Sequence, residues 1–333
     1  MNRINITLIF LFLLLATGCS KAPTSPNNSS GWVQVTAHAP FAGRYGLSGT
    51  VFNNSMWVIG GASSNANASV TYWYNDVWSS SDGAHWNLVN GNAPFGGRFG
   101  SQVLSYNGKL WLIAGNQSGT LMNDVWSSND GISWTQVLAN TAPNGFHFGV
   151  REDLGAVVFN NQMVILGGTA SSVSYNDVWS SVDGITWNQL SLGNFPARWG
   201  FATAVFNNRI WIMDGASGGP SPNKVFSDTW NSLDGITWNQ VTNYVAPGEI
   251  YFLQAIVNQG QIWKTGGYVY VAGGAMNEVY NSSNGSNWTF LSNPPFPQRF
   301  YHLSLSFNNQ VWIIGGMDNF KSYQYYNDVW HGP

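Results

Sequence analysis

The chain contains little charge. Of 333 residues, 12 are Lys or Arg and 15 are Asp or Glu, so charged residues make up 8% of the sequence, where about 25% is usual. The formal net charge is −3, and the few basic residues are scattered rather than clustered. Nucleic-acid binding needs a basic patch that follows the phosphates, so the composition excludes that class of function.

Cysteine and histidine are also scarce. The one cysteine, Cys19, leaves no intrachain disulfide to form. The five histidines are far apart and have no metal-ligand spacing, and no nucleophile elbow, phosphate-binding loop or dinucleotide motif occurs in a suitable context. We therefore expect neither a metal ion nor a cofactor. The histidines are His38, His85, His147, His302 and His331.

The long hydrophobic run of the chain lies at its beginning, from Ile6 to Ala16, and is short for a membrane span. It is typical of a signal peptide. The letters LATGC that end at Cys19 resemble the bacterial lipobox, with Ala16 where Leu is usual. The resemblance implies a signal peptide over residues 1–18, lipid on Cys19 and a flexible tether over residues 19–30. Because Ser20 rather than Asp follows Cys19, it also implies the outer membrane; the alternative is an ordinary cleaved signal peptide.

Repetition is the main feature of the rest of the sequence. A tryptophan follows a DG, NG or similar turn at intervals of 48, 53, 51 and 50 residues, at Trp86, Trp134, Trp187, Trp238 and Trp288. Each unit also holds an apolar strand, a turn such as FNN, a second apolar strand that ends in Gly, and the letters NDVW or a variant of them (SDTW, NEVY). Asn-rich and DG turns are typical of tight hairpins. Each unit therefore predicts four antiparallel strands in a meander, as in a propeller blade.

The number of strands predicts how the ring closes. Six second strands are present, but only five fourth strands follow an NDVW motif. The segment NSSGWVQV before the first unit resembles the missing strand, with Trp32 as its tryptophan. Residues 31–333 are therefore expected to form one all-β, six-bladed propeller whose N-terminal strand completes the last blade and removes the open edges.

The paired glycines, the aromatic residue of NDVW and the tryptophan of DGxxW together resemble kelch repeats. The resemblance implies a propeller architecture that serves substrate adaptors, galactose oxidases and sialic acid mutarotases, so the fold does not assign a function. The galactose oxidase cofactor requires a cysteine bonded to a tyrosine, and Cys19 lies in the signal segment.

Five of the seven arginines occupy one repeat position. In the fifth unit that position is Glu249, or Ile250 if the neighbouring turn has no extra residue. In kelch substrate adaptors, arginines at similar positions line the ligand pocket, so one interpretation is a positive ring that binds a carboxylate or phosphate. The alternative is that each arginine pairs with the acid of an NDVW motif. The arginines are Arg44, Arg98, Arg151, Arg198 and Arg299, and the acids are Asp76, Asp124, Asp177, Asp228, Glu278 and Asp328.

Three residues break the repeat in the fourth and fifth units: Asp214, Glu249 and Lys264. A lysine in a strand covered on both faces needs an acidic partner, and we expect Glu249 or Glu278. The group is interpreted either as an ion pair that keeps the fifth blade folded or as a catalytic acid/base set of Glu249 and Lys264.

Aromatic residues are frequent in the loops expected on the face with the arginines. They suit sugar or peptide ligands or pack the loops; the ligand candidates are Tyr72, Trp73, Tyr268 and Tyr325. The tryptophans that follow each DG turn, and Trp32, are expected to pack the blades.

The sequence thus predicts a membrane-anchored binding module of the cell envelope without a cofactor, whose partner is an anionic glycan or an acidic peptide held by the arginines, Glu249 and these aromatic residues. The alternative function is a sugar mutarotase or epimerase that acts on an acidic sugar.

Overall fold

The computed structural model describes residues 31–65, 69–142, 145–219, 222–242, 248–318 and 324–333. The expected signal peptide, Cys19 and the tether lie outside these residues. The secondary structure of the described residues is entirely β, and none of it is a helix long and apolar enough to cross a membrane.

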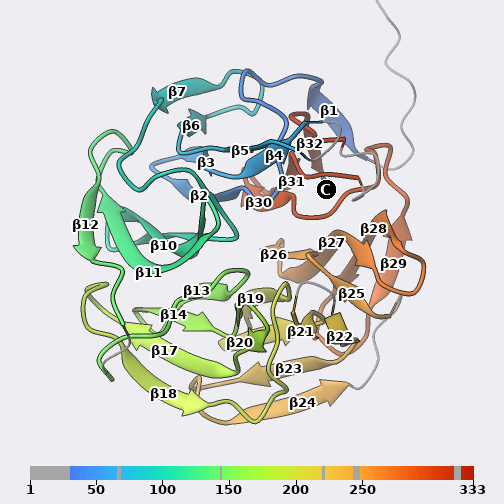
Figure 1. Cartoon of the computed structure of the whole chain (residues 1–333). Helices are drawn as coiled ribbons and strands as arrows, with labels where there is room; N and C mark the ends of the chain where they lie inside the picture. The colour runs from blue at the N-terminus through green and yellow to red at the C-terminus, as the bar shows by residue number, and fades with distance from the viewer. Residues whose placement is uncertain (1–30, 66–68, 143–144, 220–221, 243–247, 319–323) are drawn as a thin grey trace, which may run out of the picture.

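The strands form six antiparallel four-stranded meanders around a central axis (Figure 1). The innermost strands of successive blades are neighbours all the way round. This confirms the predicted six-bladed propeller. From the axis outward, blade 1 contains β2 (Ser48–Phe52), β3 (Ser55–Ile59), β6 (Val77–Ser80) and β7 (Asn87–Asn90); blade 2 contains β9 (Gln102–Tyr106), β10 (Lys109–Gln117), β11 (Thr120–Ser128) and β12 (Thr135–Leu138); blade 3 contains β13 (Gly155–Phe159), β14 (Gln162–Leu166), β17 (Asp177–Ser181) and β18 (Asn188–Leu192).

The other three blades repeat this order, and short accessory strands extend the blades on one face of the ring. Blade 4 contains β19 (Ala202–Phe206), β20 (Arg209–Met213), β23 (Thr229–Ser232) and β24 (Trp238–Thr242); blade 5 contains β26 (Gln254–Asn258), β27 (Gln261–Val269), β28 (Gly274–Ser282) and β29 (Thr289–Ser292); blade 6 contains β30 (Leu303–Phe307), β31 (Gln310–Ile314), β32 (Val329–Gly332) and β1 (Val33–Thr36). The accessory strands are β4 (Ala62–Ser64), β5 (Thr71–Trp73), β8 (Arg98–Phe99), β15 (Thr169–Ala170), β16 (Val173–Ser174), β21 (Ala216–Gly218), β22 (Pro222–Val225) and β25 (Ile250–Tyr251).

The N-terminal strand closes the ring. Strand β1 pairs antiparallel with β32, and Val33 lies opposite His331 while Gln34 lies opposite Trp330. The two ends of the propeller are therefore side by side in blade 6 (Figure 1). Blade 6 therefore takes three strands from the C-terminal part of the chain and its fourth strand, β1, from the N-terminal part.

The Asn-rich turns between the first and second strands adopt the conformation that the sequence predicts. Asn53 and Asn54 have φ values of 47° and 55°, and Asn207 and Asn208 have 48° and 54°. Two consecutive residues at positive φ form a tight hairpin turn that matches the twist of the strands. Asparagine adopts this conformation at lower cost than most residues.

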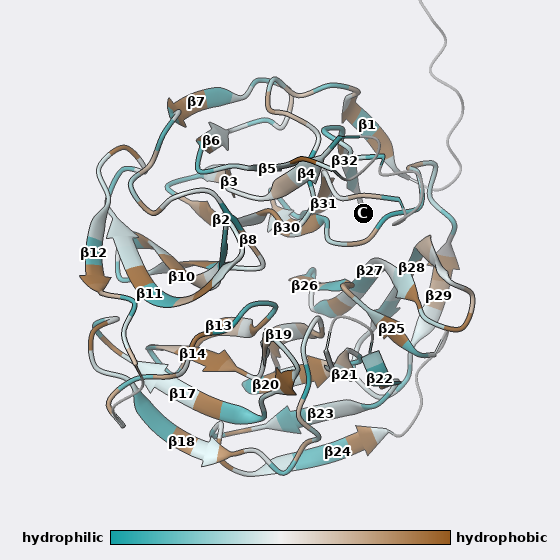
Figure 2. Cartoon of the chain, in the orientation of Figure 1, coloured by the Kyte–Doolittle hydropathy of each residue, from teal (hydrophilic) through white to brown (hydrophobic). Residues whose placement is uncertain are grey.

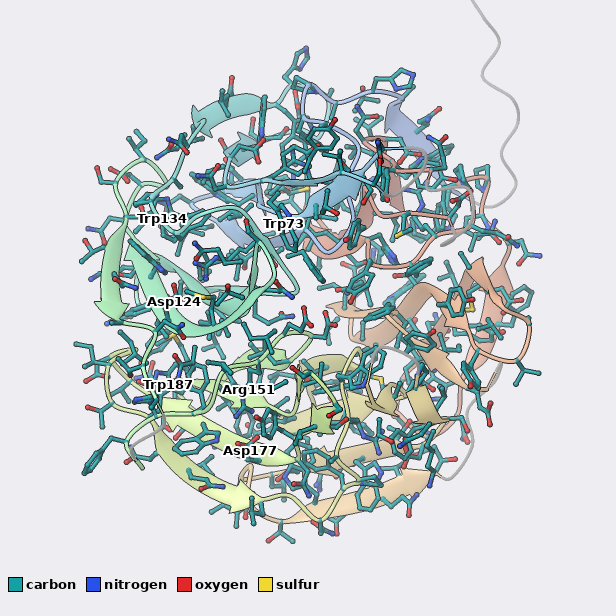
Figure 3. The ribbon with its side chains drawn as sticks, viewed as in Figure 1. Trp73, Asp124, Trp134, Arg151, Asp177 and Trp187 are labelled. Atoms are coloured by element: carbon teal, nitrogen blue, oxygen red, sulfur yellow. The ribbon has the colours of Figure 1, made fainter. Side chains whose placement is uncertain are left out.

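The repeated tryptophans belong to apolar clusters that join neighbouring blades. Figure 2 shows that hydrophobic residues, in brown, recur in the strands of the blades. In Figure 3, Trp134 and Trp187 lie near the outer ends of blades 2 and 3. Each packs edge-to-face on a phenylalanine of a neighbouring loop, with ring centres 5.1 Å apart for Trp134 and Phe95 and 5.1 Å apart for Trp187 and Phe148. Their burial agrees with the predicted role in blade packing.

Candidate functional site

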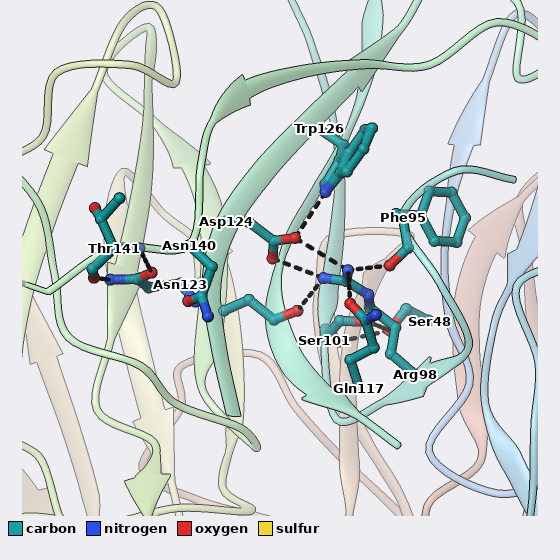
Figure 4. A network of polar contacts seen from close by, with 11 residues as sticks. Ser48, Phe95, Arg98, Ser101, Gln117, Asn123, Asp124, Trp126, Asn140 and Thr141 are labelled. Carbon is teal, nitrogen blue, oxygen red and sulfur yellow. Dashed lines mark hydrogen bonds and ion pairs between the residues drawn. The ribbon is translucent and has the colours of Figure 1, made fainter. Parts of the chain in front are cut away.

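The conserved geometry of the arginine position is clearest at Arg98 (Figure 4). Its two terminal nitrogens donate to the two carboxylate oxygens of Asp124 at 2.8 and 3.0 Å, and Nη1 also donates to the Ala114 carbonyl at 3.0 Å. The Arg98 side chain is 0% exposed. The guanidinium is therefore held inside blade 2, where it connects the segment before the first strand to the second and third strands.

The other four arginines make the same paired contact with the acid of their own blade, at 2.5–3.1 Å. Each guanidinium also lies over an aromatic ring that precedes that acid by two residues, at 3.9–4.5 Å from the ring centre. All are buried, and Figure 3 labels one pair, Arg151 and Asp177. The structure thus places these arginines as the pairing interpretation expects, away from any ligand-accessible surface. The pairs are Arg44 with Asp76, Arg151 with Asp177, Arg198 with Asp228, and Arg299 with Asp328.

In blade 5 the arginine position is occupied by Ile250, the second of the two residues that the sequence allowed, and not by Glu249. The Gly215 amide donates to the Ile250 carbonyl at 2.9 Å, as the Gly61 amide donates to the Arg98 carbonyl at 2.7 Å. Ile250 is buried and Glu249 is exposed. Glu278, the acid of this blade, accepts a hydrogen bond from the Tyr280 hydroxyl at 2.6 Å instead of pairing with an arginine.

Lys264 pairs with Asp214 rather than with Glu249 or Glu278, which corrects the expected partner. The Lys264 ammonium lies 2.5 Å from the Asp214 carboxylate, and both side chains are buried. Burial raises the pKa of Asp214, and the charge of Lys264 opposes that shift. The pair joins blades 4 and 5, so two of the three residues that break the repeat compensate each other. The proposed acid/base pair of Glu249 and Lys264 is therefore not brought together.

Two residues after the arginine position, a ring of backbone hydrogen bonds encircles the axis. One amide from each blade donates to the equivalent carbonyl of the preceding blade, at 2.6–3.2 Å, and the sixth bond closes the circle. All six residues have a left-handed backbone, with φ between 54° and 63°. They are Gly46, Gly100, Asp153, Gly200, Phe252 and Tyr301.

Three members of this hydrogen-bonded ring are not glycine. Gly46, Gly100 and Gly200 adopt the left-handed conformation without steric cost, whereas a residue with a Cβ atom gives up about 1–2 kcal/mol there. The exceptions are Asp153, Phe252 and Tyr301 in blades 3, 5 and 6. Non-glycine residues held in this conformation are characteristic of functional sites, and the side chains of all three line one pocket.

This pocket, which we call the axial cup, opens at the end of the axis that carries the accessory strands and has a volume of about 280 Å³. Its wall comes largely from the residue that follows the arginine position, which is Tyr45, Phe99, Glu152, Trp199 and Tyr251 in blades 1 to 5. Its floor comes from the non-glycine members of the hydrogen-bonded ring. The complete lining is Tyr45, Phe99, Glu152, Asp153, Thr169, Ser171, Trp199, Gly219, Tyr251, Phe252 and Tyr301.

The polar groups of the axial cup include two carboxyl groups and the phenol of Tyr301, which lie close together. The Tyr301 hydroxyl donates to Asp153 Oδ2 at 2.7 Å. Desolvation and the neighbouring charge of Glu152 raise the pKa of Asp153 well above its ordinary value, and desolvation also raises the pKa of Glu152. The pKa of Tyr301 is raised by burial and by both acids. Groups with raised pKa values in a cavity are candidates for binding or proton transfer.

The aromatic rings of the cup are packed against one another. Phe252 and Tyr301 stack with ring centres 3.6 Å apart, and Trp199 lies 5.2 Å from Phe252 and 5.4 Å from Tyr251. The Trp199 indole N–H donates to the Gly218 carbonyl at 2.9 Å. The faces of these rings are therefore held in fixed positions around the carboxyl groups.

Three of the four aromatic ligand candidates do not line the cup but pack on aromatic rings that do. Trp73 packs on Phe99 with centres 5.4 Å apart, Tyr268 packs on Tyr251 at 5.2 Å, and Tyr325 stacks on Tyr45 at 5.7 Å. Tyr72 is 51% exposed on β5 and lies outside the cup.

The sequence carries a signal for this site at the two positions after the shared arginine. After the shared arginine, blades 1, 2 and 4 continue with an aromatic residue and a glycine, whereas blade 3 continues with Glu152 and Asp153. Blade 3 therefore replaces both repeat residues with acids. The importance of the two positions becomes clear only when the backbone places one of them on the cup wall and the other on its floor.

The described residues contain no cluster of three or more His, Cys, Asp or Glu side chains that could hold a metal ion. The fold and the cup define a six-bladed propeller with a pocket at one end of its axis. A solved structure with this fold is that of YjhT, which matches with a TM-score of 0.68 and 16% sequence identity over 89% of this chain and 95% of the other. No protein-family model and no curated protein sequence matches the chain.

Proposed function

We propose that the protein is a ligand-binding propeller of the cell envelope that holds one sugar residue of a glycan in the axial cup. The observation that carries this proposal is the combination of fixed aromatic faces with the Asp153 carboxyl, the Glu152 carboxyl and the Tyr301 hydroxyl in one cavity. Sugars stack their C–H faces on aromatic rings and form hydrogen bonds through their hydroxyl groups. The volume of about 280 Å³ lies at the small end of ligand pockets, which begin near about 300 Å³.

The arrangement of the arginines gives no support to an anionic ligand. Their donors are used by the acids and carbonyls of their own blades, as at Arg98. The described lining of the cup contains Glu152 and Asp153 but no Lys, Arg or His, so it offers an anionic glycan or acidic peptide no opposite charge. We therefore assign the ligand to the cup and not to the arginine ring.

The position in the envelope is a proposal that rests on the sequence. Lipid on Cys19 would hold the propeller at a membrane through residues 19–30, with the outer membrane as the proposed location. Such a tether leaves the axial cup free to meet glycans near the membrane surface.

Binding is tested with a glycan array followed by titration calorimetry, using the Cys19→Ala protein to avoid lipid. Two matched variants separate the candidate sites, Glu152→Gln in the cup and Glu249→Gln on the surface outside it. We expect Glu152→Gln to weaken binding of the selected glycan about tenfold or more, because a ligand hydroxyl loses its hydrogen bond to the carboxyl group. Glu249→Gln should bind as the parent does. The reverse result, or a protein that binds no glycan, would contradict the proposal.

A second candidate function is a mutarotase-like enzyme, which the carboxyl pair itself favours. One carboxylate would take the proton of the anomeric hydroxyl while a protonated carboxyl donates a proton to the ring oxygen, so that the C1–O5 bond opens. Reclosure on the other face returns both protons. Exchange spectroscopy by NMR would show faster anomer exchange with the parent protein than with Asp153→Asn. If the parent protein and Asp153→Asn give equal rates of anomer exchange and both bind the sugar, the enzyme function is contradicted and the binding function remains.

A further inference from the structure

We propose that the group recognised in the axial cup is a protonated amine, so that the ligand is a sugar or related small molecule with a free ammonium group. This inference rests on the proposed function of the cup and adds the charge of its ligand.

The first argument is how this fold treats acids elsewhere. Within the described residues, the acids buried in the blades each contact a cationic side chain at 2.5–2.8 Å. Four of them pair with an arginine, and the fifth, Asp214, pairs with Lys264. The propeller therefore neutralises a buried negative charge within the fold. The five acids are Asp124, Asp177, Asp214, Asp228 and Asp328.

Glu152 and Asp153 depart from this pattern. Neither forms an ion pair within the described part of the chain, and no Lys, Arg or His lines the cup. Glu152 Oε2 is buried and has no hydrogen-bond partner among the described residues. An unpaired carboxylate in a partly desolvated site is costly, and a cationic ligand supplies the missing charge.

The second argument is the aromatic surround. The rings of Tyr45, Phe99, Trp199, Tyr251 and Tyr301 lie on the same cavity as the two acids. An ammonium over the face of a tryptophan or tyrosine is attracted by the negative face of the ring, most strongly where water is excluded. Aromatic faces combined with carboxylates recognise organic ammonium groups, whereas a metal ion needs more oxygen ligands than two acids provide.

The third argument is the backbone cost of this arrangement. Asp153 occupies a left-handed position, with φ of 54°, where three other blades have glycine, and Glu152 occupies a position that is aromatic in the other five blades. The fold gains no ion pair in return. A requirement other than stability therefore explains the two acids, in keeping with the tendency of functional sites to break local rules.

The experiment compares two probes that differ in charge, the methyl glycosides of glucosamine and of N-acetylglucosamine, by calorimetry at pH 7. We expect the amine to bind at least tenfold more tightly than the N-acetyl form. Asp153→Asn and Glu152→Gln should each remove most of that preference, while Glu249→Gln, which changes an exposed acid outside the cup, should retain it. Circular dichroism and thermal melts establish that each variant is folded.

The outcomes separate this inference from the proposed function. Equal binding of the two probes, tighter binding of the N-acetyl form, or binding of array glycans but of neither probe overturns the ammonium inference and leaves a sugar-binding cup. Absence of binding to both probes and to the array overturns both. A preference for the amine that survives Asp153→Asn and Glu152→Gln places the amine elsewhere and also overturns the inference.

Discussion

At the scale of single residues, Asp153 is unusual because it lines the axial cup while its backbone has an unfavourable left-handed conformation. Its left-handed conformation suits glycine, and its carboxyl group lies in a partly desolvated site. Replacement by glycine removes both costs and gives up one hydrogen bond from Tyr301, worth about 1 kcal/mol. The same position in blade 2 is Gly100, which provides a matched test in the opposite direction.

We predict that Asp153→Gly raises the free energy of unfolding by about 1 kcal/mol at pH 8, whereas Gly100→Asp lowers it by about 1–3 kcal/mol. A Cβ atom at Gly100 would lie 2.8 Å from the Asp153 carboxylate, which adds to the loss. Urea unfolding measures both values. Loss of folding in Asp153→Gly would mean that the carboxyl group is needed for the ring itself.

The gain should depend on pH. The folded-state pKa of Asp153 is raised above its ordinary value near 3.8, so this group favours the folded state below the ordinary value, and the contribution is lost as pH rises through the raised value. The advantage of Asp153→Gly over the parent should therefore increase with pH above 4. Unfolding curves at pH 4 and pH 8 measure this difference, and an advantage that is largest at pH 4 would contradict the sign of the shift.

Residues of this kind mark the limit of sequence reasoning. The positive φ of Asn53 and Asn54 was predictable because a local turn motif specifies it. The positive φ of Asp153, Phe252 and Tyr301 was not, because it follows from hydrogen bonds between blades far apart in sequence. Similarly, Lys264 visibly needed a partner, but only the packing of two blades identifies Asp214.

At the scale of the element, each arginine connects the segment before the first strand of its blade to the third strand, through the acid of that strand. We predict that Arg98→Ala destabilises the protein by about 3–5 kcal/mol, because it leaves the buried Asp124 carboxylate without its cation. Chemical unfolding of Arg98→Ala is compared with that of Arg209→Ala. Arg209 is partly exposed and makes one hydrogen bond, of 3.3 Å, to Asn231, so its loss should cost less than about 1 kcal/mol. A well-folded Arg98→Ala protein that has lost only ligand binding would restore the anionic-ligand hypothesis.

The closing strand β1 is the second element with a clear prediction. Deletion of residues 31–36 removes the pairing with β32 and the buried Trp32 ring, which packs on Phe296 with centres 5.1 Å apart. Loss of such a ring alone costs about 3–5 kcal/mol, so the thermal midpoint should fall by more than 10 °C or the protein should not fold. Deletion of residues 20–26 serves as the control and should leave the melt unchanged. An unchanged melt without residues 31–36 would contradict the closure.

At the scale of the whole molecule, the fold was predictable from the sequence to the level of blade number and closure. Each blade repeats the same strand and turn motifs, so the six copies all predict the same four-stranded unit. The site was only partly predictable, because it lies where the copies differ. The arginines recur at one repeat position, and because that position is buried, each of them pairs with an acid of its own blade. Glu152 and Asp153 occur once each, and their meaning depends on the axis around which the blades meet.

The attachment of the molecule to a membrane is the last prediction. Metabolic labelling with a palmitate analogue should mark the parent protein and not Cys19→Ala, and the variant should move into the soluble exported fraction. We expect this result because lipid on Cys19 would anchor the protein, since two or more acyl chains hold a protein stably at a bilayer. Equal labelling of both proteins would contradict lipidation of Cys19 and would favour an ordinary cleaved signal peptide.

The pairing of β1 with β32 also means that the beginning of this chain has no special place in the fold. A Cβ atom added to Gly31 would lie 3.4 Å from the Pro333 ring, so the two ends of the propeller almost touch. The first and last described strands of the chain are therefore neighbours in one sheet. A circular permutant that joins these ends and opens the exposed turn at Ser118 and Gly119 would keep every strand pairing and the whole axial cup. The strand pairings therefore fix the order of the blades around the axis, and they are compatible with a chain that begins at a different blade.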